Sequence, residues 1–198
     1  MSADVLPASF YDRDTDTVAR RLIGKIVVRS HRGGTMSGRI VETEAYLTGD
    51  AASHSFNGPT TRNAAMFGPP GRAYVFFTYG VHFMFNCVTR RPGIGEAVLI
   101  RAIEPVDGIA AMRENRGARS GVPDWRLCSG PGNVARALDI HRDLNGADLT
   151  DRSGELMVVD APCIDDGEIA VTTRIGIRRA ADLRLRFYLR ASKSVSRR

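Results

Sequence analysis

Arg39-Ile-Val-Glu-Thr-Glu-Ala-Tyr46 is the most informative stretch of this sequence. Its alternation is typical of a β-strand, in which Ile40, Glu42, Glu44 and Tyr46 point to one face. Two carboxylates and a phenol do not suit an apolar core, because burying an unpaired carboxylate costs several kcal/mol. The same pattern also fits a solvated edge strand whose glutamates form salt bridges. The stretch therefore predicts a strand and leaves open whether its acids are functional.

Length and composition indicate one globular domain spanning residues 1–198, with enough apolar residues for a sizeable core. No apolar run is long enough to span a membrane, and Met1–Asp12 lacks the pattern of a signal peptide. Cys87, Cys128 and Cys163 are far apart and form no CxxC pair. This arrangement favours free thiols in a reducing compartment over structural zinc. We therefore expect a cytoplasmic protein.

The chain is basic, with 28 Lys and Arg against 22 Asp and Glu, a net charge of +6 and a pI near 9.7. Such a charge is compatible with a nucleic acid partner, although an Arg-rich solvated surface explains it equally well. Neither Lys25 nor Lys193, the only lysines, has neighbours that suggest an activated amine, so imine chemistry is disfavoured. There is no cluster of ligating residues and no GxGxxG or P-loop pattern, so we expect neither a metal nor a cofactor. Gly130 and Gly132 are a weak indication of a phosphate-binding turn at a helix start, where a plain N-terminal cap is the commoner outcome.

Hydrophobic periodicity and turn residues predict the elements. Helices are expected at Asp14–Ile23 and Pro105–Arg116, and a third is expected to begin near Pro131 and end at Leu138. Strands are expected at Lys25–Arg29, Met36–Leu47, Ala73–Phe77, Phe83–Val88, Ala97–Ile103, Leu156–Val159, Ile169–Ile177 and Leu183–Leu189. Residues 48–70 form a long loop, and long ordered loops are often functional. We expect one compact α+β domain, with a curved, mainly antiparallel sheet flanked by helices and a protruding β-hairpin.

The tip of the expected hairpin carries Tyr79 beside Gly80. An aromatic side chain exposed at a turn of a basic protein suggests a residue that stacks on or wedges into nucleic acid. The alternative is a ring that folds back on its own hairpin.

Two polar side chains interrupt apolar strands. Arg101 lies within Val98-Leu-Ile-Arg-Ala-Ile103 and needs an anionic partner if it is buried, which Glu42 or Glu44 could supply. It could equally lie on a wet strand face. Asn86 is expected to form a hydrogen bond, most often with the backbone.

Taken together, several motifs resemble the alkyladenine (3-methyladenine) DNA glycosylase family. The first four are Arg39–Tyr46, Ala52-Ser-His-Ser55, Thr61-Arg-Asn63 with Met66-Phe67, and Tyr79-Gly80 with Asn86. The others are Val98-Leu-Ile-Arg-Ala-Ile-Glu-Pro105, Leu127-Cys-Ser-Gly-Pro131, and Arg174-Ile-Gly-Ile177 with Leu185-Arg-Phe-Tyr188. The matches run in order from about Asp14 to the last residues, and their combination is specific although no single piece is.

This resemblance implies a monofunctional, metal-free enzyme of base-excision repair. It implies that the enzyme flips alkylated or deaminated purines out of double-stranded DNA and hydrolyses their N-glycosidic bonds, leaving abasic sites. The expected substrates are 3-methyladenine, 7-methylguanine, hypoxanthine and ethenoadenine. The expected protein is a monomer of bacterial type that needs no membrane and is associated with the nucleoid through DNA binding.

The resemblance also implies which residues are catalytic. The residues alone do not distinguish Glu42 from Glu44, and it is the family match that selects Glu44 as the general base. Arg101 and the backbone carbonyl of Ile175 match the groups that hold the attacking water beside that carboxylate.

The substrate-binding residues follow from the same resemblance. Tyr46, His54 and Phe76 match the walls around the flipped base, with a backbone amide at His54 facing the purine edge. Asn86 matches the residue that disfavours the exocyclic amine of guanine. Phe76 replaces a tyrosine of the vertebrate members, which preserves stacking and removes one hydroxyl.

For contacts with the duplex, Tyr79 matches the wedge that fills the gap in the DNA, and Gly80 and Arg62 are expected to contact DNA beside it. His82 departs from the family pattern near this wedge. Two other classes stay open on the residues alone. One is a non-catalytic, basic nucleic-acid-binding module on the same fold, and the other is a hydrolase or transferase of small nucleosides or formyl groups.

Overall fold

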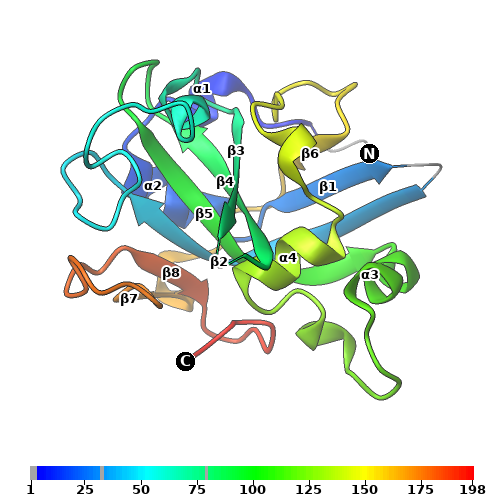
Figure 1. Cartoon of the computed structure of the whole chain (residues 1–198). Coiled ribbons are helices and arrows are strands. Elements are labelled where there is room, and N and C mark those ends of the chain that lie inside the picture. Colours follow the sequence, from blue (N-terminus) through cyan, green and yellow to red (C-terminus); the bar gives the residue numbers. More distant parts are fainter. Residues whose placement is uncertain (1–3, 32–33, 79) are drawn as a thin grey trace.

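A curved sheet of eight strands forms the centre of the computed structural model, which describes residues 4–31, 34–78 and 80–198 (Figure 1). The strands are β1 Ile26–His31, β2 Gly34–Tyr46, β3 Ala73–Thr78, β4 His82–Thr89, β5 Glu96–Asp107, β6 Leu156–Val159, β7 Ile169–Thr172 and β8 Arg186–Leu189. The sheet order is β3-β4-β5-β2-β1-β6, and β8 pairs with both β2 and β7. All pairs among these described strands are antiparallel, which confirms the predicted α+β fold.

The longest described strand, β2, lies inside the sheet, so the alternative of a solvated edge strand is wrong. One side of β2 pairs with β5 along most of its length. The other side pairs with β1 over residues 34–39 and with β8 over residues 42–44. The register between β2 and β5 shifts between Ile40 and Thr43, and such irregularities bend a strand and re-aim its side chains. The bend therefore falls where the two glutamates lie.

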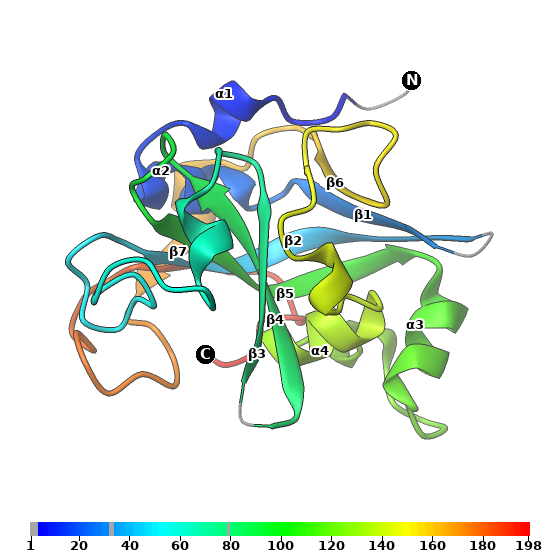
Figure 2. The same cartoon turned by 45° about the horizontal axis from the view of Figure 1, so that its top comes forward.

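Short helices cover the sheet on both sides. In the described part of the chain they are α1 Ala8–Tyr11, α2 Thr15–Leu22, α3 Ile109–Arg116 and α4 Pro131–Ala137, with 3₁₀ turns η1 Ala64–Phe67, η2 Asp124–Arg126, η3 Arg142–Leu144 and η4 Asp166–Glu168. The hydroxyl of Thr43 donates to the carbonyl oxygen of Ala19 in α2 at 2.9 Å. Because Thr43 points away from the face of Glu42 and Glu44, α2 covers the opposite face. Figure 2 shows the β3–β4 hairpin protruding from the sheet at the bottom of the view.

The main core fills the space between the sheet and the helices. Its large, fully buried side chains include Leu22 of α2, Ile40 of β2, Ile100 and Ile103 of β5, and Leu138 after α4.

A second, smaller cluster consists of Met66, Tyr74, Val88 and Ala97, against which Tyr46 packs. The register of β4, β5 and β2 aligns Val88, Ala97 and Tyr46, so this cluster lies on the same face as Glu44.

Most predicted elements are confirmed, including the hairpin, the helix that begins at Pro131, and Leu156–Val159. Several ranges are wrong at one end, and the predicted strand Leu183–Leu189 begins only at Arg186. The predicted helix Pro105–Arg116 begins only at Ile109, because β5 continues to Asp107 and Gly108 then adopts a left-handed conformation with φ 70°. The predicted strand Ile169–Ile177 ends at Thr172, and residues 173–185 form a loop before β8. None of the helices in the described part of the chain has the length and apolar character needed to cross a membrane.

Candidate active site

A row of side chains crosses the sheet face that α2 leaves uncovered. The strand register aligns Tyr74, Asn86, Leu99, Glu44 and Arg186 across β3, β4, β5, β2 and β8. Directly opposed residues of antiparallel strands project from the same face. A fully buried carboxylate is thereby placed between apolar and aromatic side chains on one side and a guanidinium on the other.

The carboxylate of Glu44 accepts three hydrogen bonds. Oε2 accepts from the hydroxyl of Tyr46 at 2.9 Å and from Nη1 of Arg101 at 3.1 Å, and Oε1 accepts from the backbone N–H of Ile175 at 2.7 Å. Burial raises the pKa of Glu44 above its ordinary value of 4.5, although these three donors act in the opposite direction. Glu44 is therefore an unusually basic carboxylate, as a general base requires.

Glu42 has a different environment, although it is also fully buried. It accepts hydrogen bonds from Nε of Arg101 at 3.1 Å and Nε of Arg186 at 2.7 Å. The backbone N–H and hydroxyl of Ser196 add two more, at 2.6 and 2.9 Å. Arg101 is thus held between two carboxylates. Burial acts against its positive charge, but Glu44 and Glu42 outweigh that effect and raise the pKa of Arg101. The alternative of Arg101 on a wet strand face is wrong, because only 7% of the residue is exposed.

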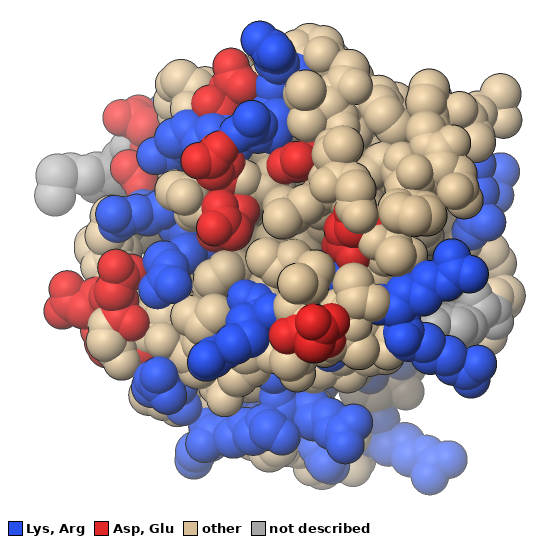
Figure 3. Space-filling model, turned by 90° about the vertical axis from the view of Figure 1, so that its left-hand side faces the viewer, with Lys and Arg blue, Asp and Glu red and all other residues tan. Residues whose placement is uncertain are grey.

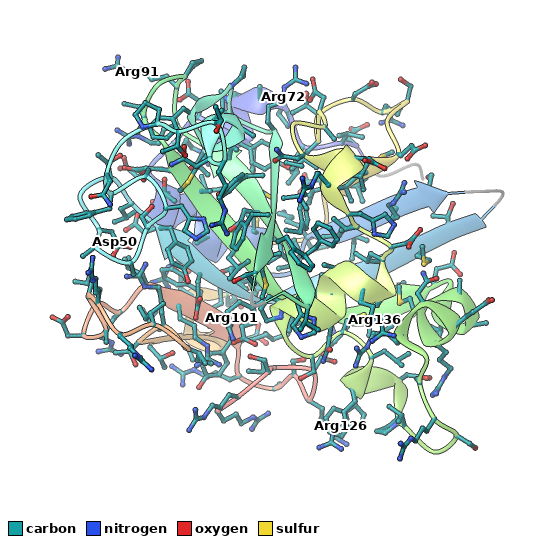
Figure 4. The ribbon with its side chains drawn as sticks, viewed as in Figure 1. Asp50, Arg72, Arg91, Arg101, Arg126 and Arg136 are labelled. Carbon is teal, nitrogen blue, oxygen red and sulfur yellow. The ribbon has the colours of Figure 1, made fainter. Side chains whose placement is uncertain are left out.

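A cavity of about 370 Å³ opens on this face, and that volume falls at the small end of the range for ligand pockets. Aromatic rings of Tyr46, His54, Tyr74 and Phe76 line it. Asn86 and Arg101 add polar side chains, and the segment 175–177 also lines the cavity. Glu44 lies directly behind this lining, because three of the lining residues donate to its oxygens. Figure 4 shows Arg101 near the centre of the molecule, below the β3–β4 hairpin.

The aromatic wall is fixed by its own contacts. The ring centroids of His54 and Phe76 lie 4.4 Å apart, and Nδ1 of His54 is 2.9 Å from the hydroxyl of Tyr74. Burial lowers the pKa of His54, aided by Arg62, so its ring is neutral at neutral pH. Burial raises the pKa of Tyr74 to about 12, so its hydroxyl stays protonated. This wall therefore presents flat, uncharged surfaces to the cavity.

The loop at residues 173–185 is attached to the site by Arg174. Its guanidinium pairs with both carboxylate oxygens of Asp50, one at 2.9 Å, and donates to the carbonyl oxygen of Ala45 at 3.0 Å. The same group lies 4.7 Å from the ring centroid of Tyr46. This contact anchors the residue next to Ile175, and it therefore holds the N–H that donates to Glu44. Asp50 lies on the long loop after β2, at the left of Figure 4.

The structure brings most of the predicted site residues together at this one cavity. They are Glu44, Tyr46, His54, Phe76, Asn86, Arg101 and Ile175. Asn86 donates to the carbonyl oxygen of Tyr74 at 3.0 Å, the backbone bond expected of it. The contact with Glu44 is made by the amide of Ile175, whereas the expected role belongs to its carbonyl.

The predicted DNA contacts lie apart from the cavity lining. Arg62 is exposed and donates to the carbonyl oxygen of Phe77 on the hairpin at 3.1 Å, and Gly80 is exposed in the hairpin turn with φ 67°. Tyr79 lies outside the described residues.

Sequence reasoning missed Tyr74, Asp50 and the role of Arg174. Arg174 stood in a quoted motif, but only its burial and its pairing with Asp50 show what it does.

A buried, polarised carboxylate behind a small aromatic cavity suits hydrolysis of a bond to a flat ring. Comparison with known proteins specifies the class further. The model of the methylpurine-DNA glycosylase family matches residues 9–193. A protein of Methanoculleus marisnigri is 51% identical over 98% of this chain and 99% of its own length. One from Carboxydothermus hydrogenoformans is 47% identical over the same shares. One from Mesorhizobium japonicum is 52% identical over 92% of this chain and 86% of its own. All three carry the name "Putative 3-methyladenine DNA glycosylase".

The chain belongs to the methylpurine-DNA glycosylase family. It is a DNA glycosylase, an enzyme of base-excision repair. The alternative of a non-catalytic binding module on this fold is therefore set aside.

Proposed function

We propose that this glycosylase excises alkylated and deaminated purines from double-stranded DNA through a water activated by Glu44. The proposed bases are 3-methyladenine, 7-methylguanine, hypoxanthine and ethenoadenine, the product is an abasic site, and the protein acts as a monomer. One observation carries this proposal: the fully buried carboxylate of Glu44 lies behind a cavity of about 370 Å³ with aromatic walls.

The size and walls of the cavity suit a single nucleobase that has left the duplex. A base inside a double helix hides its glycosidic bond, so the nucleotide must first be extruded, at a cost of a few kcal/mol that is smallest for damaged bases. Tyr46 on one side and His54 with Phe76 on the other offer ring faces for stacking. Because the rings of His54 and Tyr46 are neutral, they accept both cationic and neutral purines.

The chemistry follows from the position of Glu44. Cleavage of the glycosidic bond develops oxocarbenium character at C1′, which a nearby carboxylate stabilises. In our proposal Glu44 also takes the proton from the attacking water, while Arg101 and the backbone carbonyl of Ile175 orient it. General-base assistance of this kind contributes about 10²–10⁴-fold in rate. Purines alkylated at N3 or N7 leave as neutral bases, whereas hypoxanthine and ethenoadenine need a proton as they leave.

Selectivity is proposed to depend on the edge of the base. Asn86 is 4% exposed and lines the cavity, and its side-chain amide is oriented by the bond to the carbonyl oxygen of Tyr74. A base whose exocyclic amine finds no acceptor beside this fixed amide is disfavoured, because that amine would be a buried donor without a partner, at a cost of about 1–3 kcal/mol. We propose that Asn86 rejects normal guanine in this way.

The test is incubation with duplexes that each carry one of the four lesions, followed by alkaline cleavage to detect abasic sites. Undamaged duplex and the corresponding free nucleosides serve as controls, and one series contains a chelator. We expect abasic sites in lesion-bearing duplexes alone, with no loss of activity in the chelator series. Release of bases from free nucleosides, with none from duplexes, would instead support a hydrolase of small nucleosides.

A further inference from the structure

The positive charge of this chain is concentrated in its last 25 residues. Residues 174–198 contain nine Lys and Arg against the single acid Asp182, whereas residues 1–173 contain 19 Lys and Arg against 21 Asp and Glu. The net charge of +6 therefore comes entirely from the segment that follows β7. Arginine occurs along the whole chain, but eight of the 26 arginines lie in these 25 residues, where almost no acid balances them.

The first part of that segment borders the cavity. Ile175, Gly176 and Ile177 line it, and Arg178 and Arg179 follow immediately. Both arginines are exposed, while Arg174 before them is buried and paired with Asp50. The backbone from which Arg178 and Arg179 project is thereby anchored at the rim of the cavity.

The last part of the segment reaches the same site from the other direction. Ser196 donates to Glu42, and its hydroxyl oxygen lies 3.4 Å from Nη2 of Arg101. Arg197 and Arg198 follow and are exposed. Arg186 donates to the carbonyl oxygen of Arg197, so this backbone is also held in place.

Figure 3 shows the side of the molecule on which the loop between β7 and β8 and the C-terminus lie. The lowest part of that face, at the level of the C-terminus in Figure 1, carries mainly Lys and Arg side chains. Among the described residues, none of Arg178, Arg179, Arg197 and Arg198 forms an ion pair with a carboxylate. Exposed guanidinium groups without acidic partners, beside a cavity for a nucleobase, are suited to phosphate oxygens.

We propose that Arg178, Arg179, Arg197 and Arg198 form a phosphate-binding surface, here called the arginine rim, that holds the DNA backbone beside the flipped nucleotide. Arg178 and Arg179 lie within two residues of Ile177, and Arg197 and Arg198 lie within two residues of Ser196. Two residues correspond to at most about 7.6 Å between Cα atoms. Neighbouring phosphates of the strand that enters the cavity are therefore within reach of both pairs. The arginine rim rests on the proposed function, because it assumes that a nucleotide of duplex DNA enters this cavity.

Salt dependence of DNA binding tests the arginine rim. The logarithm of the binding constant falls with the logarithm of salt concentration with a slope of about −0.9 for each phosphate contacted in duplex DNA. The variants are R178A/R179A and R197A/R198A, and fluorescence anisotropy on an undamaged duplex is measured between about 50 and 200 mM salt. We expect the slope to become shallower by about 1.8 in each double variant, which is two contacts at 0.9 each.

Two further sets of variants make the result specific. The control variant R21A/R91A removes the same amount of charge from two other exposed positions. Arg21 lies on α2, across the sheet from the cavity, and Figure 4 shows Arg91 at the top left, away from Arg101. We expect its slope to stay nearer that of the wild-type protein. R178K/R179K and R197K/R198K keep the charge, and they should keep the slope.

The outcomes separate the two proposals. Unchanged slopes in both rim variants, an equal change in R21A/R91A, or loss of the slope in the Lys variants would each overturn the arginine rim. Lesion excision by the wild-type protein is scored independently. If it releases no base from any lesion duplex, the proposed function fails whatever the slopes are.

Discussion

Replacing Glu44 with glutamine changes one atom in the most enclosed part of the site. The carboxylate accepts hydrogen bonds on both oxygens, whereas glutamine has one acceptor and one amide donor. If its oxygen faces Tyr46 and Arg101, its NH₂ group meets the N–H of Ile175, which then loses its acceptor. A buried donor without a partner costs about 1–3 kcal/mol. This sets the scale of the expected loss of stability.

An opposing effect reduces that loss. A raised carboxyl pKa means that the native state binds the proton more tightly than the unfolded chain does. The contribution of Glu44 to the free energy of unfolding is therefore greatest below pH 4.5 and falls as the pH rises through the native pKa. Glutamine has no charge to bury at neutral pH. With Tm shifting by about 2–4 °C per kcal/mol in a chain of this size, Glu44→Gln should stay folded at assay temperature.

The rate should respond far more strongly than stability. Loss of a general base slows a reaction by about 10²–10⁴-fold, equivalent to about 3–5 kcal/mol of activation free energy. Single-turnover release of hypoxanthine from a duplex, at saturating protein, measures the reaction without product release. Thermal melting followed by circular dichroism checks the fold. We expect base release to fall by that factor while the protein melts close to the wild-type temperature.

Glu104→Gln is the matched control for this experiment. Glu104 lies on β5 and accepts hydrogen bonds from Nε of Arg39 at 2.9 Å and from the hydroxyl of Ser192 at 2.6 Å, away from the cavity. It should release hypoxanthine at the wild-type rate. A folded Glu44→Gln protein that binds DNA and releases hypoxanthine within a few-fold of the wild-type rate would refute Glu44 as the base.

Three further substitutions test how Glu44 is supported. Tyr46→Phe removes a hydroxyl that stabilises the ionised form of Glu44, so the pKa of Glu44 should rise further. The acid limb of the pH–rate profile should then move to higher pH, and a limb that does not move would contradict this role of Tyr46. Glu42→Gln leaves two buried guanidinium groups short of an acceptor, so both Tm and excision rate should fall, and wild-type values of both would show the network to be dispensable. Asp50→Ala breaks the buried ion pair with Arg174 and should destabilise the protein by about 3–5 kcal/mol. Urea unfolding measures this loss, and an unchanged midpoint would show that the Asp50–Arg174 pair does not hold the loop at residues 173–185.

Local pattern was sufficient to predict much of the fold. Alternation predicted that Glu42, Glu44 and Tyr46 share a face, and apolar runs around a glycine turn predicted the β3–β4 hairpin. These features depend on neighbours along the chain, which periodicity records directly. The predicted start of α3 was wrong for the opposite reason: residues 105–107 pair with β2, which is far away in sequence.

The contacts that define the site are long-range, and the strand pattern alone could not predict them. Ser196 binds Glu42 across 154 positions, and Arg174 binds Asp50 across 124. Periodicity shows which residues share a face but not which strand or loop lies opposite. It therefore indicated that Arg101 needs an acid, without showing that it is held by both candidates at once.

The difference between the two glutamates is the physical basis of the site. Both are fully buried on one strand face, yet their partners differ. Glu42 accepts from two guanidinium groups and from Ser196, whereas Glu44 accepts from one guanidinium group, that of Arg101, and from two neutral donors, the hydroxyl of Tyr46 and the N–H of Ile175. Buried ion pairs are often no more stabilising than apolar side chains of the same shape, so stability alone does not account for this network. Glu42 orients Arg101 and shares its positive charge with Glu44, and burial raises the pKa of Glu44 next to the cavity despite that guanidinium. The strand pattern makes the two acids look equivalent, and the groups packed around them are what distinguish the proposed base from the residue that supports it.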